Sequence, residues 1–405
     1  MKRIDELDLP NLPMEDAAFA SNPWPYLAAA RQRHPWLARC SFGHVVHQFD
    51  AMKDLLGQDA YLQTRIDRVI SIMGAEGTQW GRFQSESILT RQGLAHQRIR
   101  SVLAPAFTPR QANRHRPLMR AVITELLDEW VPKREFDFEA FASNFPIGVM
   151  CSLIGASRAV IPQLRSSLEA FGLSFSLDKE HLPALENATN VLDEFVQNLV
   201  AERQAARRQD GEEDLLEILL QTQDRGELGA RELYDLLIFL FVAGYDTSKN
   251  ALTLMMSVLI DNPGIYAQCA EDLEYCRKVV EENFRYLTTS TIPRVAVQDL
   301  PYRDVLIPEG STLFFPVSIA GRDPGAHQDA DRFDPDREEI RRHLTFGMGG
   351  HICLGQFIAR AQIQEGLHLI AQRMKNPRRV GPSRWRPFYG VWGMRGLPIA
   401  FDPAN

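Results

Sequence analysis

A glycine-rich segment around a cysteine, residues 346–355, contains the side chain best suited to bind a metal. Cys353 lies just before residues 356–374, in which apolar side chains recur at helical spacing. At the start of a helix, unpaired N–H groups and the positive end of the dipole lower the pKa of a thiol and favour the thiolate, which ligates metals. Upstream glycines let the backbone fold tightly around the sulfur. The pattern therefore predicts a metal-binding thiolate.

Three alternatives compete with this interpretation. Cys353 could be a small buried hydrophobic residue, as free cysteines usually are. A dinucleotide-binding loop would need glycine where Ile352 stands, so the GxGxxG pattern fails. A zinc site is disfavoured because His351 and Cys353 have no partner pair at zinc-finger spacing.

A second polar group interrupts an otherwise apolar helical stretch, residues 231–260. Gly244, Asp246 and Thr247 lie near its middle, where glycine alone costs about 1 kcal/mol. A gap in the helix wall would admit a small ligand, and an acid beside a hydroxyl could relay protons. The alternative is a packing notch in which Thr247 bonds back to its own helix.

These groups must be positioned by a mainly helical protein. Residues 231–260 are apolar on all sides, which predicts a long, deeply buried helix. Strand-like pieces are few, at 295–297 and 312–317, and residues 382–402 are expected to form loops and short hairpins. No repeat or flexible linker is apparent, so we expect one domain over residues 1–405.

The composition is that of an ordinary globular protein, with 45% hydrophobic and 24% charged residues. The net charge of −7 gives no general attraction for nucleic acid or anionic lipid. The longest apolar run, residues 236–243, is far shorter than the roughly 20 residues that span a bilayer. Five cysteines without CxxC spacing suit a reducing compartment. We expect a cytoplasmic monomer that does not bind nucleic acid or membrane.

Residues 346–355 match F-G-x-G-x-H-x-C-x-G at all six fixed positions, and this segment resembles the haem-binding loop of the cytochrome P450 family. Residues 243–247 resemble the family's A-G-x-[DE]-T oxygen-activation motif. The resemblance implies the family fold, mainly α with small β-sheets, and haem b buried between the long central helix and the cysteine-loop helix. It makes Cys353 the axial thiolate, which favours O–O cleavage.

The resemblance also implies roles for further residues. Asp246 and Thr247 correspond to the catalytic acid–alcohol pair. The motif residues expected to contact haem are Ala243, Gly244, Phe346 and Gly355, and those expected to hold its propionates are His96, Arg100, Arg294 and His351. Glu282 and Arg285, at i, i+3, are expected to form a buried structural triad with Arg332.

The implied activity is that of a monooxygenase, which inserts one atom of dioxygen into a small hydrophobic substrate. The sequence has no GxGxxG and no second domain, so electrons from NAD(P)H are expected to arrive through a reductase and a ferredoxin or flavodoxin. Loose candidates for a basic docking patch are Arg98, Arg341, Arg342 and Arg360, and the expected pocket residues are Phe239, Val242, Ala243, Ile292 and Val391.

Two other functions fit a haem protein of this fold. A peroxide-driven enzyme or an isomerase does not activate dioxygen, and such members tend to lack the acid–alcohol pair that Asp246 and Thr247 form here. A haem-based sensor would need neither a proton relay nor an electron donor, and would normally carry an output domain.

Overall fold

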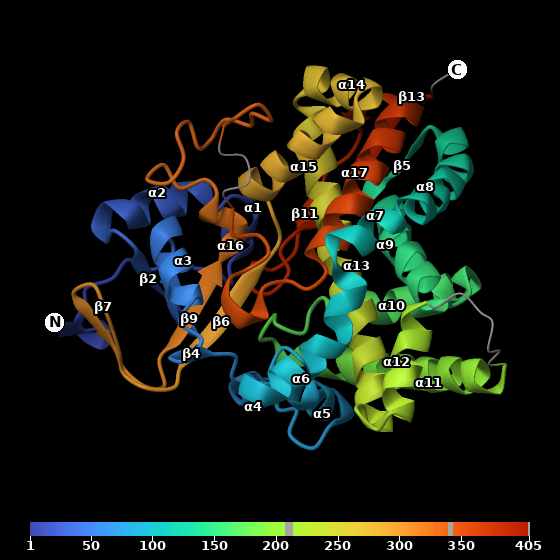
Figure 1. Cartoon of the computed structure of the whole chain (residues 1–405). Coiled ribbons are helices and arrows are strands. Elements are labelled where there is room, and N and C mark those ends of the chain that lie inside the picture. Colours follow the sequence, from blue (N-terminus) through green and yellow to red (C-terminus); the bar gives the residue numbers. More distant parts are fainter. Residues whose placement is uncertain (207–213, 339–342, 404–405) are drawn as a thin grey trace.

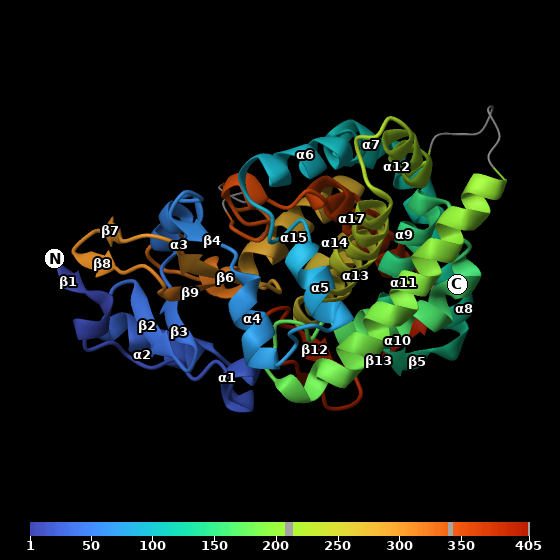
Figure 2. The same ribbon diagram turned by 90° about the horizontal axis from the view of Figure 1, so that it is seen from below.

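Helices form most of the protein, as the sequence predicts, and the largest sheet lies to one side of them (Figures 1 and 2). The structure is a computed structural model that describes residues 1–206, 214–338 and 343–403. The longer helices are α8 (Arg116–Trp130), α9 (Phe138–Ile154), α11 (Leu182–Ala205), α13 (Ala230–Ile260), α15 (Leu273–Tyr286) and α17 (Gln356–Arg373). The shorter helices are α1 (Ala17–Ser21), α2 (Trp24–Arg33), α3 (Phe49–Leu56), α4 (Ile66–Met73), α5 (Gln79–Glu86), α6 (Gly93–Leu103), α7 (Pro109–Arg114), α10 (Ile161–Phe171), α12 (Leu215–Asp224), α14 (Pro263–Glu271) and α16 (Val317–Ala320).

The central helix α13 has 31 residues and confirms the helix predicted at 231–260. It begins after Gly229, whose N–H donates to Glu232 Oε2 at 3.1 Å and so satisfies one free donor of the first turn. It packs against α9, α11, α10 and α17, which explains why apolar residues surround it. Helix α17 confirms the helix predicted after Cys353.

The largest sheet has the strand order β2-β3-β9-β6-β4, in which only the β3–β9 pair is parallel. Its strands are β2 (Leu37–Cys40), β3 (Gly43–Val46), β4 (Leu62–Gln63), β6 (Thr291–Ala296) and β9 (Thr312–Pro316). The register pairs Arg294 on β6 with Leu313 on β9. The sheet lies beside the helical part in both views, so β6 and β9 bring their residues toward the cysteine loop (Figures 1 and 2).

The remaining sheets are smaller, with the orders β1-β8-β7, β10-β13-β5 and β11-β12. Their strands are β1 (Lys2–Arg3), β5 (Glu135–Asp137), β7 (Leu300–Tyr302), β8 (Val305–Ile307), β10 (Met374–Arg379), β11 (Arg384–Trp385), β12 (Met394–Arg395) and β13 (Pro398–Pro403). The loops and short hairpin predicted for 382–402 are confirmed up to β12, whereas β13 is the middle strand of a sheet with β10 and β5. No described helix is long and apolar enough to cross a membrane.

Candidate active site

The cysteine loop is closed by a backbone hydrogen bond and held by an acid from another part of the chain. The Cys353 N–H donates to the Phe346 carbonyl at 2.8 Å. Gly349 has a φ of 72°, and a Cβ on it would lie 2.7 Å from Asp59 Oδ2. The neighbouring Gly350 N–H donates to the same oxygen at 2.6 Å. Glycine is needed here for both its backbone conformation and its small size.

Cys353 is exposed, whereas the other four cysteines are buried. Burial nevertheless raises the pKa of its thiol, against the N–H of Gly355 and the charges of Arg100 and Arg360, which lower it. The sulfur is therefore accessible to solvent and still has enough protein atoms around it to be partly desolvated. The prediction that the pKa of the Cys353 thiol is lowered is wrong for the protein alone. Desolvation of the thiol outweighs the effect of the N–H groups at the start of α17.

The polar segment of α13 combines an exposed residue with a buried acid. Ala243 is exposed in the middle of this buried helix, and the Thr247 hydroxyl donates to its carbonyl at 2.9 Å. This is the back-bonded arrangement of the alternative interpretation. Asp246 is buried, and its Oδ2 accepts from Arg386 Nη1 at 2.5 Å.

Two further side chains of α13 complete this buried network. Asn250 Nδ2 donates to Asp246 Oδ1 at 3.1 Å, and Lys249 Nζ lies 3.3 Å from that oxygen. The fully buried Lys249 also pairs with Glu139 Oε1 at 2.7 Å. Burial alone would raise the pKa of Glu139, but the Lys249 ammonium outweighs it and the pKa is lowered. Lys249 stands out in an apolar helix three residues from Asp246, a signal that sequence reasoning missed.

Basic side chains outnumber acids around the cysteine loop, where Asp59 is the nearby carboxylate. Arg294 is only 6% exposed, and among the described residues no carboxylate pairs with it. Its Nη1 donates only to the adjacent Pro293 carbonyl at 2.9 Å, and burial lowers the pKa of its guanidinium to about 10, with Asp59 opposing. Arg100 Nη2 donates to the Ile352 carbonyl at 2.7 Å.

Two histidines belong to the same group. The His96 and His351 rings lie 4.1 Å apart. Burial, followed by His96 and Arg294, lowers the pKa of His351 to about 4, while burial and then Arg100 lower the pKa of His96. The structure thus brings His96, Arg100, Arg294 and His351 together in a region short of negative charge.

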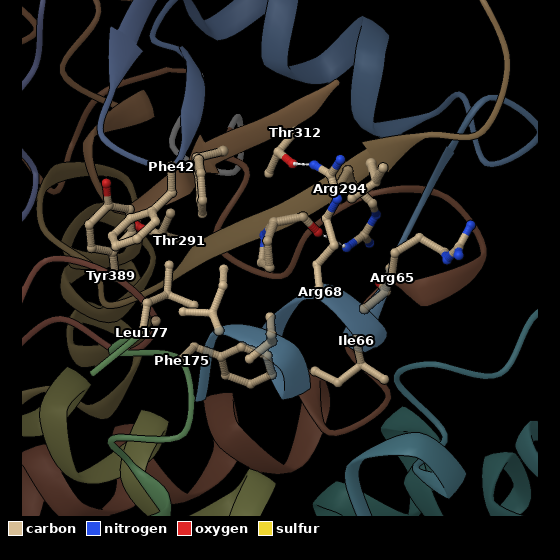
Figure 3. Close-up of a pocket in the computed structure, with 17 residues that line it drawn as sticks. Phe42, Arg65, Ile66, Arg68, Phe175, Leu177, Thr291, Arg294, Thr312 and Tyr389 are labelled. Atoms are coloured by element: carbon tan, nitrogen blue, oxygen red, sulfur yellow. Dashed lines mark hydrogen bonds between the residues drawn. The ribbon is translucent and has the colours of Figure 1, made fainter. Parts of the chain in front are cut away.

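A cavity of about 80 Å³ lies between α4, the sheet and the turn that follows α10 (Figure 3). Phe42, Ile66, Phe175, Leu177 and Tyr389 provide apolar walls. None of the five predicted pocket residues, Phe239, Val242, Ala243, Ile292 and Val391, lines this cavity, although Thr291, Pro293 and Gly390 beside two of them do.

Comparison with known proteins gives one consistent result. The family model described as Cytochrome P450 matches residues 155–376. Luteothin monooxygenase of Streptomyces thioluteus is 31% identical over 98% of this chain and 97% of its own length. The chain belongs to the cytochrome P450 family. Mycinamicin IV hydroxylase/epoxidase of Micromonospora griseorubida is 30% identical over 85% of this P450 and 90% of its own length.

Solved P450 structures share the fold. The structure of CalO2 has a TM-score of 0.87 at 22% identity, covering 98% of this P450 and 100% of that chain. P450BioI in complex with an acyl carrier protein that carries hexadec-9Z-enoic acid has a TM-score of 0.86 at 24% identity, covering 95% and 100%. The P450 family uses haem with a cysteine thiolate ligand, and the two relatives from Streptomyces thioluteus and Micromonospora griseorubida are a monooxygenase and a hydroxylase/epoxidase.

The residues of this P450 fit haem. A buried guanidinium without a carboxylate partner is costly, and a propionate would supply the missing charge at Arg294. The accessible surfaces of Cys353 and Ala243 lie on the cysteine loop and on α13, the two elements between which the family places its cofactor.

One predicted structural residue needs correction. Glu282 and Arg285 form a fully buried pair, with Arg285 Nη2 donating to Glu282 Oε1 at 2.7 Å. The third arginine is Arg337, whose Nε lies 3.3 Å from Glu282 Oε1. Arg332 contributes only its carbonyl, to Arg285 at 2.9 Å, while its own side chain is exposed and pairs with Asp334. The turn after Asp329 directs the Arg332 side chain outward.

The two described arginines of the expected basic docking patch are neutralised by carboxylates. Arg98 pairs with Glu232, and Arg360 pairs with Glu281 at 2.6 Å. Arg341 and Arg342 lie outside the described residues.

Proposed function

We propose that this P450, acting as one domain over residues 1–405, hydroxylates or otherwise oxidises a small hydrophobic compound with dioxygen as co-substrate. The observation that carries this proposal is the arrangement on α13. There the exposed residue Ala243, the Thr247 hydroxyl and the buried Asp246 carboxylate lie within two helical turns. Peroxide-driven enzymes and isomerases need no acid–alcohol pair to handle protons.

Cofactor binding is assigned to the residues around the cysteine loop. The Cys353 sulfur would ligate the iron, with the Gly355 N–H favouring its thiolate form. His96, Arg100, Arg294 and His351 would hold the two propionates, with Phe346, Ala243 and Gly244 beside the ring. When bound, haem supplies the redox-active iron at which dioxygen is activated.

Proton handling is assigned to α13. The Thr247 hydroxyl can hold a proton at Oγ1 and present it to the accessible side of the helix, once it releases the Ala243 carbonyl. Asp246 can carry a proton at either carboxyl oxygen, once it separates from Arg386 or Lys249. The apolar walls around Phe175 and Tyr389 exclude water from the substrate.

Electrons would come from a separate ferredoxin or flavodoxin served by an NAD(P)H-dependent reductase. The described chain carries no glycine-rich dinucleotide loop, and weak electron-transfer contacts are small and steered by charge. The five free cysteines suit the cytoplasm, and we expect a monomer.

The test is turnover of the haem-loaded protein with a surrogate ferredoxin, its reductase and NADPH on a panel of hydrophobic compounds. We expect a product that carries one oxygen atom from labelled dioxygen and that is lost when ferredoxin is left out. Product formation with hydrogen peroxide alone, and none with dioxygen and the electron donors, would instead indicate the peroxide-driven enzyme.

A further inference from the structure

The cavity between α4 and the sheet contains an unusual set of charges. Its lining includes Arg65, Arg68 and Arg294 but no aspartate or glutamate, in a protein whose net charge is −7. The rest of the lining is mostly apolar, so the cavity combines a hydrophobic wall with charged residues that are all positive. An apolar ligand without charge would gain nothing from this arrangement.

The three arginines differ in their partners. Arg65 makes two hydrogen bonds to the Asp67 carboxylate, at 3.0 and 2.9 Å, and its side chain turns away from the cavity (Figure 3). Arg294 is buried beside the cysteine loop, where the proposed function assigns it to a propionate. Arg68 remains, and no described carboxylate forms an ion pair with it.

Arg68 is held in place without being neutralised. Its Nη1 donates to Thr312 Oγ1 on β9 at 2.6 Å, which directs the guanidinium across the cavity toward the sheet (Figure 3). Its remaining N–H groups form a planar fork suited to two oxygen atoms of one anionic group. Phe42, Phe175 and Leu177 line the same cavity and can cover an apolar body.

We propose that the substrate of this P450 has an apolar body and an anionic oxygen group, a carboxylate or a phosphate, which Arg68 binds. The proposal rests on the proposed function, because it treats this cavity as part of the route to the oxidised carbon. The cavity of about 80 Å³ is smaller than the roughly 300 Å³ of ordinary ligand pockets, so its lining must move apart on binding. Phe175 and Leu177 lie in a turn outside any helix or strand, where the backbone can shift more easily than within α4 or the sheet.

The test uses ligands that differ only in charge. Binding of dodecanoate, dodecyl phosphate and dodecanol, and of 4-phenylbutanoate and 4-phenylbutanol, is measured by calorimetry on haem-loaded and haem-free protein. Arg68→Gln removes the proposed contact, and Arg65→Gln on the same helix is the matched control, because Asp67 already neutralises Arg65. We expect Arg68→Gln to lower the affinity for the anions about tenfold and the affinity for the alcohols less than twofold. Arg65→Gln should change neither affinity much.

The outcomes separate the proposals. The anion, phosphate or carboxylate, whose affinity falls more in Arg68→Gln is the one that Arg68 recognises. No preference of the wild-type protein for anions over alcohols, or equal weakening of both by Arg68→Gln, overturns the proposal. Faster haem loss in Arg68→Gln without a change in anion binding would assign Arg68 to the cofactor and overturn it too. Failure of the proposed function would appear separately, as binding without turnover.

Discussion

The carboxylate of Asp246 and the guanidinium of Arg386 form a buried ion pair of 2.5 Å between residues 140 positions apart in the sequence. The pair fits because residue 172 is glycine: a Cβ there would lie 2.3 Å from Asp246 Oδ2 and 2.7 Å from Arg386 Nη1. Lys249 and Asn250 lie near the other oxygen of Asp246. A proton that passes through Asp246 therefore has to compete with these partners for the carboxylate oxygens.

Asp246→Asn should slow product formation by about a hundredfold or more, because an amide cannot supply the proton that a carboxylic acid carries. The variant leaves the Arg386 charge buried and unpaired, which costs stability. The double variant Asp246→Asn, Arg386→Met should recover the stability but not the rate. Undiminished turnover in either variant would show that protons take another route.

Thr247→Ala should divert reducing equivalents from product to hydrogen peroxide while haem content stays the same. The hydroxyl donates to the carbonyl of the exposed Ala243, and its loss removes a proton donor from that part of α13. The measurement is the ratio of product to NADPH consumed. Thr253→Ala, which removes a buried hydroxyl of the same helix bonded to the Lys249 carbonyl, is the control and should leave that ratio unchanged.

Lys249→Met should destabilise the protein by about 3–5 kcal/mol at neutral pH, because it leaves buried carboxylates without their shared cation. In the wild type the lowered pKa of Glu139 contributes stability that is complete above the ordinary value of 4.5 and is lost as pH falls through the folded pKa. Without the Lys249 ammonium, burial raises the pKa of Glu139. The loss of unfolding free energy in the variant, relative to the wild type, should therefore become smaller as the pH falls from 7.5 to 5. Urea unfolding at both pH values measures it.

The double variant Lys249→Met, Glu139→Gln controls for this effect. It should regain part of the stability at neutral pH and lose the pH dependence of the deficit. If Lys249→Met lost the same amount of stability at both pH values, Lys249 would not be the group that lowers the pKa of Glu139.

Arg294→Met should act in opposite directions on the two forms of the protein. Removing an unpaired buried guanidinium should raise the stability of the haem-free protein by about 1 kcal/mol or more. It should also speed transfer of haem to apomyoglobin, because one propionate loses its partner. Arg98→Gln, which changes an exposed arginine of α6 paired with Glu232, should do neither. A loss of stability in the haem-free protein would show that Arg294 has a structural role instead.

The sequence predicted those parts of the site that lie within one segment. The cysteine loop, the interrupted helix α13 and the pair of His96 and Arg100 each depend on local spacing, and local spacing fixes which side chains share a helix face. Contacts between distant segments could not be read in this way. Arg386 and Gly172 reach Asp246 only through tertiary packing.

The errors have the same origin. Arg332 and Arg337 are five residues apart in one irregular segment, and only the path of the turn decides which side chain meets Glu282. The pKa of Cys353 was expected to follow the helix start, but burial depends on everything packed around the sulfur. The cavity walls come from six separate segments of the chain, and residues next to two of the predicted ones line it.

The most direct test of the account is the absorption spectrum of the reduced, carbon-monoxide-bound protein. With Cys353 as the axial thiolate, one b-type haem per chain should give the red-shifted band that thiolate ligation produces. Cys353→His should retain haem and lose that shift. Haem-loaded wild-type protein without the shifted band, or a Cys353→His variant that keeps it, would contradict the assignment of Cys353.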